Sequence, residues 1–219
     1  MGCRIMEKGR FIVLEGIDGS GKSSQIGPLI RRLEGLGVRC RATREPTDGP
    51  VGSLVHQTMT GRVKADNRVI AALYAADRLD HVVNDLDGLL LQIRQGITVV
   101  CDRYYFSSYA YHSVDMDMEW VIQANSVSAG LLRPTITVFL DVPVELAMER
   151  IRRDRLNEEL FEREDRLRRT RELYFQSFHR LKKEENVVVV DASGTMEQVA
   201  EGIWTAVAPY FQETSAEIW

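Results

Sequence analysis

The stretch FIVLEGIDGSGKSS, residues 11 to 24, decides the fold of this chain. Its opening residues FIVLE form a short apolar run bounded by glycine, which is typical of a buried β-strand. The residues from Gly16 to Ser23 satisfy the spacing G-x-x-x-x-G-K-[ST] of a phosphate-binding P-loop. Glycines at these positions let backbone N–H groups curl around a phosphate. The helix expected from Lys22 to about Leu36 directs its positive end at the same group.

The P-loop predicts a site for a nucleoside triphosphate. Lys22 is expected to reach the β- and γ-phosphate oxygens, and the Ser23 hydroxyl to take one coordination position of Mg²⁺. A chance match to the pattern arises in roughly one chain in a hundred of this length, and the adjoining strand and helix make chance rarer still. The predicted nucleotide-binding residues are Gly16, Ile17, Asp18, Gly19, Ser20, Gly21, Lys22, Ser23 and Ser24.

Strands and helices alternate along the rest of the chain. Four further runs rich in β-branched residues are Val38–Thr43, Ile97–Cys101, Ile136–Leu140 and Val187–Val190. Apolar residues at helical spacing lie between them. One such stripe is Leu29, Ile30, Leu33 and Leu36; another is Ile70, Leu73, Tyr74 and Leu79, extended by Val82, Leu86, Leu89, Leu90 and Ile93. This order predicts an α/β fold with a five-stranded parallel sheet and helices on both faces.

The bulk composition limits the class of protein. The 219 residues suit a single domain over residues 1–219 with a sizeable core. With 28 basic and 32 acidic residues, a net charge of −4 argues against a nucleic-acid polymer as the main partner, because counterion release needs a basic surface. No apolar run approaches the length of a membrane span, and the N-terminus lacks the apolar core of a secretory signal. We therefore expect a cytoplasmic protein without a membrane partner.

Three of the later predicted strands end in an aspartate, at Asp102, Asp141 and Asp191. In an open parallel sheet the ligand lies at the carboxyl ends of the strands, so any of the three is a candidate for the magnesium-side acid. An aspartate is also common there simply as a cap. Asp102 differs because Arg103 adjoins it, which places a guanidinium fork for a phosphate beside an acid for a metal or a hydroxyl.

A dense stretch of mixed charge, Glu149 to Glu172, contains nine arginines, eight acids and no lysine. For most of these arginines we expect exposed helical ion pairs at i,i+4 spacing. Such pairs are Glu162–Arg166, Glu164–Arg168 and Asp165–Arg169. Arg150, Arg153 and Arg155 are better candidates for clamping the transferring phosphates under a closing lid. We place this lid at about residues 150–163 and expect residues 212–219 to form a frayed tail.

A P-loop alone does not distinguish a switch GTPase, a motor, a binding ATPase and a kinase for small molecules. The chain contains no NKxD guanine signature and leaves no room for a second catalytic domain. Asp18 lies inside the P-loop, where a carboxylate is electrostatically awkward unless it faces a hydroxyl. These features favour phosphate transfer to a small acceptor that contains a sugar.

With these residues assembled, the chain resembles the thymidylate kinases, which pass the γ-phosphate of ATP to dTMP. The motifs are FIVLEGIDGSGKSSQ, TREP at 43–46, LYAADR at 73–78, DRYYFSSYAYH at 102–112 and LRPTITVFLDVPVELAMERI at 132–151. They span nearly the whole chain, and several are specific to this kinase. The resemblance implies a P-loop NTPase fold with an arginine-rich lid, the cofactors ATP and Mg²⁺, the substrate dTMP, and a homodimer.

The resemblance also implies roles for single residues. Asp18 would hold the 3′-hydroxyl of the deoxyribose, and Tyr111 would pack against the sugar. Arg44 and Arg103 would grip the dTMP phosphate. Mg²⁺ would lie beside Ser23 and Asp102.

The thymine base would be held from three sides. Tyr74 would stack on the ring, Arg78 would donate to a carbonyl, and Ser108 would touch the base edge; stacking plus a guanidinium is an inexpensive way to hold a pyrimidine. The implied catalytic residues are Lys22, Asp102, Arg103, Arg150, Arg153 and Arg155.

The chain departs from the family pattern at several positions. His112 stands where glutamine is usual, and Tyr74 where phenylalanine is common. The lid sequence RRDRLNEELFERE lacks the Arg-Gly pair of bacterial members. Gly19 follows Asp18 in place of an arginine, which in this family goes with a catalytic arginine in the lid. The helix expected around Arg78–Ile93 is a candidate dimer face.

Two alternatives remain at this stage. The first is a related P-loop kinase that acts on another nucleoside monophosphate or on a deoxynucleoside. The second is a nucleotide-dependent binding protein without turnover, which should lack the acceptor set. That set is Arg44, Tyr74, Arg78, Asp102 and Arg103, and this chain contains all of it.

Overall fold

The structure, a computed structural model, describes residues 8–154 and 160–211, without the side chains of residues 153, 154 and 160–163. A five-stranded sheet forms its centre, in the order β2-β3-β1-β4-β5, and each neighbouring pair of strands is parallel. The strands are β1 (Phe11–Glu15), β2 (Cys40–Arg44), β3 (Thr98–Asp102), β4 (Ile136–Asp141) and β5 (Val187–Asp191). The predicted five-stranded parallel sheet is confirmed, although the second strand begins at Cys40 and not at Val38.

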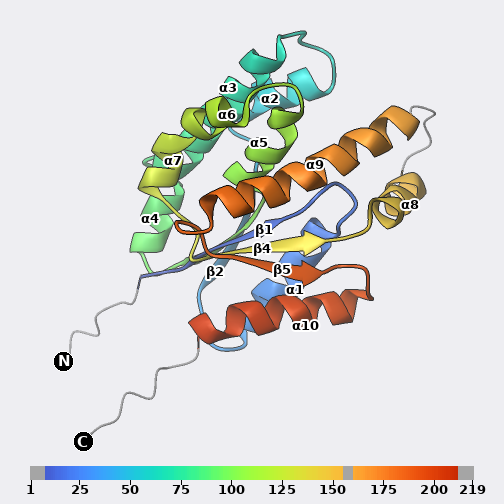
Figure 1. The fold of residues 1–219 in the computed structure, drawn as a ribbon. Helices are drawn as coiled ribbons and strands as arrows, with labels where there is room; N and C mark the ends of the chain where they lie inside the picture. The colour runs from blue at the N-terminus through green and yellow to red at the C-terminus, as the bar shows by residue number, and fades with distance from the viewer. Residues whose placement is uncertain (1–7, 155–159, 212–219) are drawn as a thin grey trace, which may run out of the picture.

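Helices cover both faces of the sheet (Figure 1). α1 (Lys22–Glu34) and α10 (Met196–Val207) pack together on one face, and α9 (Leu160–Leu181) crosses the other. The remaining helices are α2 (Pro50–Met59), α3 (Asn67–Val83), α4 (Leu89–Arg94), α5 (Tyr105–Tyr111), α6 (Met118–Ala124), α7 (Ser126–Leu131) and α8 (Val144–Asp154). Two short 3₁₀ helices are η1 (His112–Val114) and η2 (Ala208–Tyr210).

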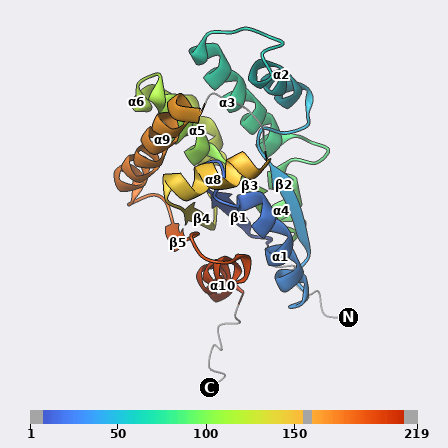
Figure 2. The same ribbon diagram turned by 90° about the vertical axis from the view of Figure 1, so that its right-hand side faces the viewer.

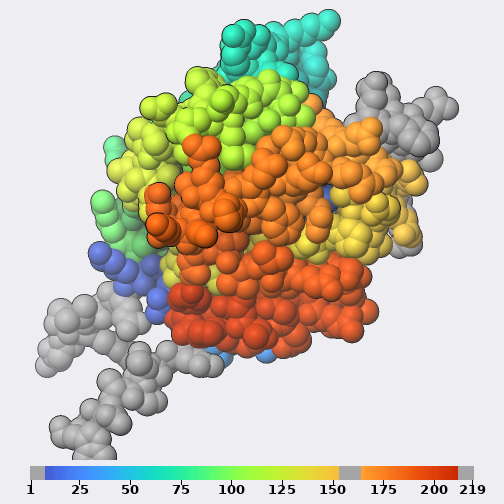
Figure 3. Space-filling view, in the orientation of Figure 1, coloured from blue at the N-terminus to red at the C-terminus, as the bar shows by residue number. Residues whose placement is uncertain are grey.

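The core lies between the sheet and these two helical layers. All five residues of β1 are buried, because the strand lies between β3 and β4 and is covered on both faces. On the α9 face, the ring of Phe139 packs at 4.8 Å from Tyr174 and 5.1 Å from Phe178. Figure 3 shows α9 lying across the middle of the molecule, with α10 below it and α5 to α7 above. Such packing on both faces explains why the strands read as continuous apolar runs.

The predicted helical stripes end earlier than the sequence suggests. α1 stops at Glu34, so Leu36 lies beyond the helix and is 57% exposed. The prediction of one long helix through Arg78–Ile93 is wrong, because the chain turns between α3 and α4. Asn84 caps this turn by accepting from the Leu86 N–H at 2.9 Å, and Leu86 is exposed. Because the Asn84 side chain binds the Leu86 N–H, that N–H is not available for a helical hydrogen bond, and the helix ends there.

The chemistry-bearing segments gather at one edge of the sheet. The P-loop follows β1, Arg103 follows β3, and α8 follows β4. Viewed from the side toward which the strands point, α8 lies beyond the ends of the strands (Figure 2). This edge is where open parallel sheets bind their ligands.

None of the helices within the described ranges is long and apolar enough to cross a membrane. The cytoplasmic location and the frayed tail at residues 212–219 stay predictions, the tail because it lies outside the described residues.

Candidate active site

The P-loop, Gly16–Ser23, depends on glycine for its shape. Gly19 and Gly21 have φ angles of 77° and 90°, in the left-handed region that other residues rarely adopt. A Cβ atom on Gly19 would lie 2.4 Å from the carbonyl oxygen of Ala147 in α8. The first turn of α1 receives no side-chain cap from Gly21, so its backbone N–H groups are available to an anion.

Lys22 lies in the floor of this loop. Its ammonium donates to the carbonyl oxygen of Ile17 at 2.9 Å and to the Ser20 hydroxyl at 3.3 Å, and the side chain is buried. Burial, together with repulsion from the Arg103 guanidinium, lowers the pKa of Lys22 to about 8. A buried cation without a bonded carboxylate is costly in the protein alone, and an anionic ligand would relieve that cost.

Asp102, of the three strand-end aspartates, is the one that contacts the P-loop. Its Oδ2 accepts from the Ser23 hydroxyl at 2.5 Å, whereas its Oδ1 is buried and has no hydrogen-bond partner among the described residues. Asp141 accepts instead from Arg171, at 2.6 and 2.8 Å, and Asp191 accepts from the Ser193 N–H. An unsatisfied carboxylate oxygen beside a hydroxyl fits Mg²⁺, which prefers oxygen ligands and takes few of them from protein.

Arg103 joins the P-loop to a neighbouring cavity. It has a φ angle of 71°, which is unusual for a residue with a side chain. Its Nη1 donates to the Gly16 carbonyl at 3.2 Å and to the Ser107 hydroxyl at 3.0 Å, and its Nη2 lies 2.5 Å from Asp18 Oδ1. The guanidinium also lies over the Tyr111 ring, 5.0 Å from its centroid. The side chain is thus fixed, with its fork at the boundary between loop and cavity.

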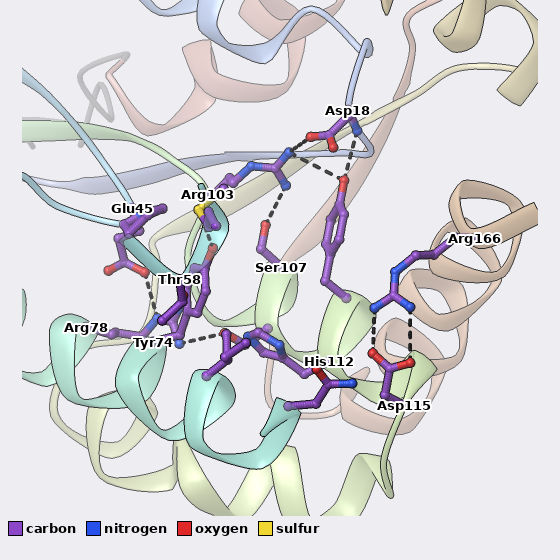
Figure 4. A pocket seen from close by; sticks show the side chains of 16 residues that line it. Asp18, Glu45, Thr58, Tyr74, Arg78, Arg103, Ser107, His112, Asp115 and Arg166 are labelled. Atoms are coloured by element: carbon purple, nitrogen blue, oxygen red, sulfur yellow. Dashed lines mark hydrogen bonds and ion pairs between the residues drawn. The ribbon is translucent and has the colours of Figure 1, made fainter. Parts of the chain in front are cut away.

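The cavity beside Arg103 has a volume of about 540 Å³. Several of the residues predicted to bind the acceptor line it together: Asp18, Tyr74, Arg78, Arg103, Ser108 and Tyr111. Figure 4 shows Arg103 and Asp18 at one end and the pair Asp115–Arg166 at the side. The Tyr111 hydroxyl accepts from the Asp18 N–H at 2.9 Å, which links the cavity wall to the P-loop. The volume of the cavity suits a ligand such as a nucleotide.

Arg78 is held more firmly than the sequence suggests. It is 1% exposed, and its Nε donates to Glu45 Oε2 at 2.7 Å. Its two terminal nitrogens donate to Ser108, to Asn125 and to the carbonyl oxygen of Tyr104. Four of its five N–H groups are therefore used by these contacts, which leaves one for a ligand in the cavity.

Comparison with known proteins identifies the family. A sequence profile of thymidylate kinase matches residues 14–203. The chain is 36% identical to the thymidylate kinase of Rhodopseudomonas palustris over 211 residues, which cover 91% of this chain and 89% of that protein. It is 33% identical to a probable thymidylate kinase of Methanocaldococcus jannaschii over 184 residues, covering 84% and 87% of the two chains.

The chain belongs to the thymidylate kinase family. Members of this family are phosphotransferases that phosphorylate dTMP with ATP, so the predicted class of enzyme is confirmed and neither alternative is favoured. The fold is the P-loop NTPase fold of these kinases, with the sheet and helices described above.

Two predicted arginines of this kinase lie away from the acceptor cavity. Arg150 donates to the carbonyl oxygens of Gly19, at 3.4 Å, and Ala192, at 3.0 Å, and it lines a second cavity of about 340 Å³ next to Met196. Arg44 is exposed, pairs with Asp48 at 2.8 Å and lines a third cavity that also includes Asp102. Their predicted roles stay predictions.

The lid is described only in part. The side chain of Arg153 and the whole of Arg155 lie outside the described residues, as does much of the predicted range 150–163. Of the predicted ion pairs, Glu164–Arg168 forms at 3.1 Å. Arg166 contacts Asp115, and Arg169 contacts Glu172 at 3.0 Å. Arg166 thus has a tertiary partner, Asp115, and Arg169 has an i,i+3 partner, Glu172, in place of the i,i+4 partner predicted for it.

Sequence reasoning missed the residues that support the predicted ones. Glu45 orients Arg78, and Ser107 and Glu15 contact each other under Arg103. Glu45 lies inside the TREP motif and Ser107 inside DRYYFSSYAYH, and this position within a family motif could have identified both from the sequence. The contact of Arg166 with Asp115, across 51 positions of sequence, carries no local signal.

His112, which lines the acceptor cavity, gives a testable dependence of stability on pH. Burial, reinforced by the nearby Arg78 cation, lowers the pKa of His112 from 6.5 to about 4. Between these pH values the unfolded chain binds more protons than the folded one, so stability present above pH 6.5 is lost as the pH falls toward 4. We expect the melting temperature to fall across this window, and His112→Gln to remove part of the fall in thermal denaturation. An equally steep fall in the variant would contradict the assignment.

Proposed function

We propose that this kinase binds ATP at the P-loop and dTMP in the cavity beside Arg103, and transfers the γ-phosphate between them to give ADP and dTDP. The single observation that supports this arrangement best is the position of Arg103. Its guanidinium contacts the Gly16 carbonyl of the P-loop and the Asp18 carboxylate at the cavity edge. A cation shared by the two sites is suited to hold the acceptor phosphate next to the donor and to stabilise charge during in-line transfer.

The donor side would use the backbone N–H groups of the P-loop, Lys22 and the start of α1. Ser23 and Asp102 would hold Mg²⁺, which when bound would supply positive charge that neutralises the donor phosphates. The buried Oδ1 of Asp102, which has no hydrogen-bond partner in the described part of the chain, supports this role. Arg150 lies over the P-loop from α8, where it would contact the donor nucleotide instead of the acceptor.

On the acceptor side, residues that line the cavity would contact the base and the sugar. Tyr74 offers a ring face for stacking, and the remaining N–H of Arg78 would donate to a thymine carbonyl. The Ser108 hydroxyl accepts a hydrogen bond from Arg78 Nη1 at 3.0 Å, so the two side chains would contact the base edge together. Tyr111 would limit the space next to the sugar.

The test of the proposed function is an ADP-release assay with dTMP, dUMP, CMP and thymidine as acceptors. We expect turnover to be highest with dTMP. Higher turnover with thymidine than with dTMP would contradict a binding site built for a monophosphate.

A second test concerns Asp18. Its carboxylate lies at the cavity edge, 43% exposed, and is expected to accept a hydrogen bond from the 3′-hydroxyl of dTMP. Since hydrogen bonds to charged groups contribute ~2 kcal/mol, the 3′-deoxy analogue should bind roughly thirtyfold more weakly than dTMP. Isothermal titration calorimetry measures both affinities. In Asp18→Asn the difference should shrink, and equal affinities in the wild type would contradict the contact.

We further propose that the kinase is a homodimer. Support comes from apolar side chains exposed on α3, α6 and α7, three helices that contact one another. They include Val83, Trp120, Val127 and Leu131, which are 44%, 42%, 58% and 46% exposed. Apolar surface of this kind favours association. Sedimentation velocity measures the state directly, and a monomer at all concentrations would contradict the proposal.

A further inference from the structure

Glu15, the last residue of β1, has a buried carboxylate that no step of the proposed reaction uses. The residue is fully buried. Its Oε1 accepts from the N–H groups of Tyr104, at 2.8 Å, and Ser107, at 3.1 Å. Its Oε2 accepts from the hydroxyls of Ser107, at 2.6 Å, and Tyr174, at 2.9 Å. Burial raises the pKa of Glu15, and four donors around the carboxylate oppose that shift by stabilising its charged form. Three of these donors come from the segment that follows Arg103.

The two peptide groups that flank Arg103 are both tied to the end of β1. The Arg103 N–H donates to the Leu14 carbonyl at 3.0 Å, and the Tyr104 N–H donates to Glu15. On the other side of the second peptide, the Cys101 thiol contacts the Arg103 carbonyl at 3.0 Å. A residue with a side chain at a φ of 71° is strained by roughly 1–2 kcal/mol, and this conformation persists only where its surroundings hold it. These contacts hold it.

Ser107 transmits the same constraint to the Arg103 side chain. A hydroxyl has one proton to donate and two lone pairs to accept with. Since the Ser107 proton is directed to Glu15, its oxygen is turned to accept from Arg103 Nη1 at 3.0 Å. Glu15 thus fixes both the backbone and the guanidinium of Arg103 without touching either the guanidinium or the cavity.

We propose that Glu15 is the positioning residue for Arg103, and that it acts through the Tyr104 N–H and the Ser107 hydroxyl. The proposal rests on the proposed function, in which Arg103 holds the acceptor phosphate. The Tyr174 hydroxyl of α9 donates to the same carboxylate. Glu15 therefore holds both the helix that follows the lid region and the segment that carries Arg103.

The test compares Glu15→Gln with a matched control, Glu185→Gln. Glu185 is also a buried carboxylate that accepts from a hydroxyl of α5, that of Tyr105 at 2.7 Å, but it has no contact with Arg103 or the cavity. A side chain displaced by about 1 Å costs up to a hundredfold in rate. Glu15→Gln should therefore raise the KM for dTMP and lower kcat by roughly ten- to a hundredfold together, with the KM for ATP within about twofold of wild type. Glu185→Gln should lower the melting temperature alone.

Ser107→Ala keeps the proposal testable if Glu15→Gln does not fold, because it removes only the hydroxyl link. It should shift the dTMP KM in the same direction by a smaller factor. Wild-type values of the dTMP KM in folded Glu15→Gln, or in Ser107→Ala, would overturn the proposal. Loss of the proposed function is a separate outcome, since it appears as wild-type enzyme that fails to phosphorylate dTMP in the same assay.

Discussion

Replacing Arg103 with alanine is expected to lower kcat/KM for dTMP by about a thousandfold or more, with the KM for ATP little changed. The expected loss is large because this guanidinium lies between the P-loop and the acceptor cavity, with contacts to Gly16 and Asp18. Its removal would also leave the Asp18 carboxylate beside the acceptor phosphate without that cation, which adds repulsion. Steady-state kinetics with each substrate varied in turn measures the effect.

Arg133→Ala is the matched control, since Arg133 is partly exposed, pairs with Glu184 and lines none of the cavities described. It should keep wild-type kinetics. Arg103→Gly tests the backbone separately, because glycine adopts a φ of 71° without strain. It should be as inactive as the alanine variant and more stable by about 1 kcal/mol. If Arg103→Ala lost ATP affinity and kept dTMP affinity, the acceptor site would lie elsewhere.

The fold was predictable because its signals are local. The FIVLE run, the glycines at positions 16 and 21 and the spacing to Lys22 lie within a dozen residues, and they determine a strand, a loop and a helix without help from the rest of the chain. The aspartate at the end of β3 was distinguishable for the same reason, since Arg103 adjoins it in sequence. Asp141, by contrast, is occupied by Arg171 from α9, which only the tertiary structure reveals.

The parts that the sequence did not predict depend on contacts between distant segments. Arg78 has a donor set divided among Glu45, Ser108 and Asn125, which lie 33, 30 and 47 positions away, so its burial has no local cause. The break at Asn84 was missed because the apolar spacing continues through it, although the turn is capped by one side chain. Periodicity records which residues can pack, and it does not record where a polar side chain interrupts the helix.

Replacing Lys22 with methionine is expected to lower kcat by about a thousandfold or more and to leave the fold as stable as the wild type or more stable. The loss of activity follows from the position of the ammonium in the floor of the P-loop, where it would follow the charge of the γ-phosphate during transfer. The gain in stability follows from burial and from repulsion by Arg103, both of which disfavour the charged lysine in the protein alone and lower its pKa. Methionine fills a similar volume without the charge.

Lys182→Met provides the control, because Lys182 is an exposed lysine beyond the end of α9 and its loss should change neither kcat nor the melting temperature. Steady-state kinetics of the three proteins tests the first expectation, and their thermal denaturation without nucleotide tests the second. A Lys22→Met protein that is both inactive and much less stable would mean that the ammonium holds the loop together through Ile17 and Ser20. A Lys22→Met protein that is stable and inactive would mean that the site keeps an unfavourable charge because its ligand needs it. Active sites often contain groups that destabilise the fold for this reason.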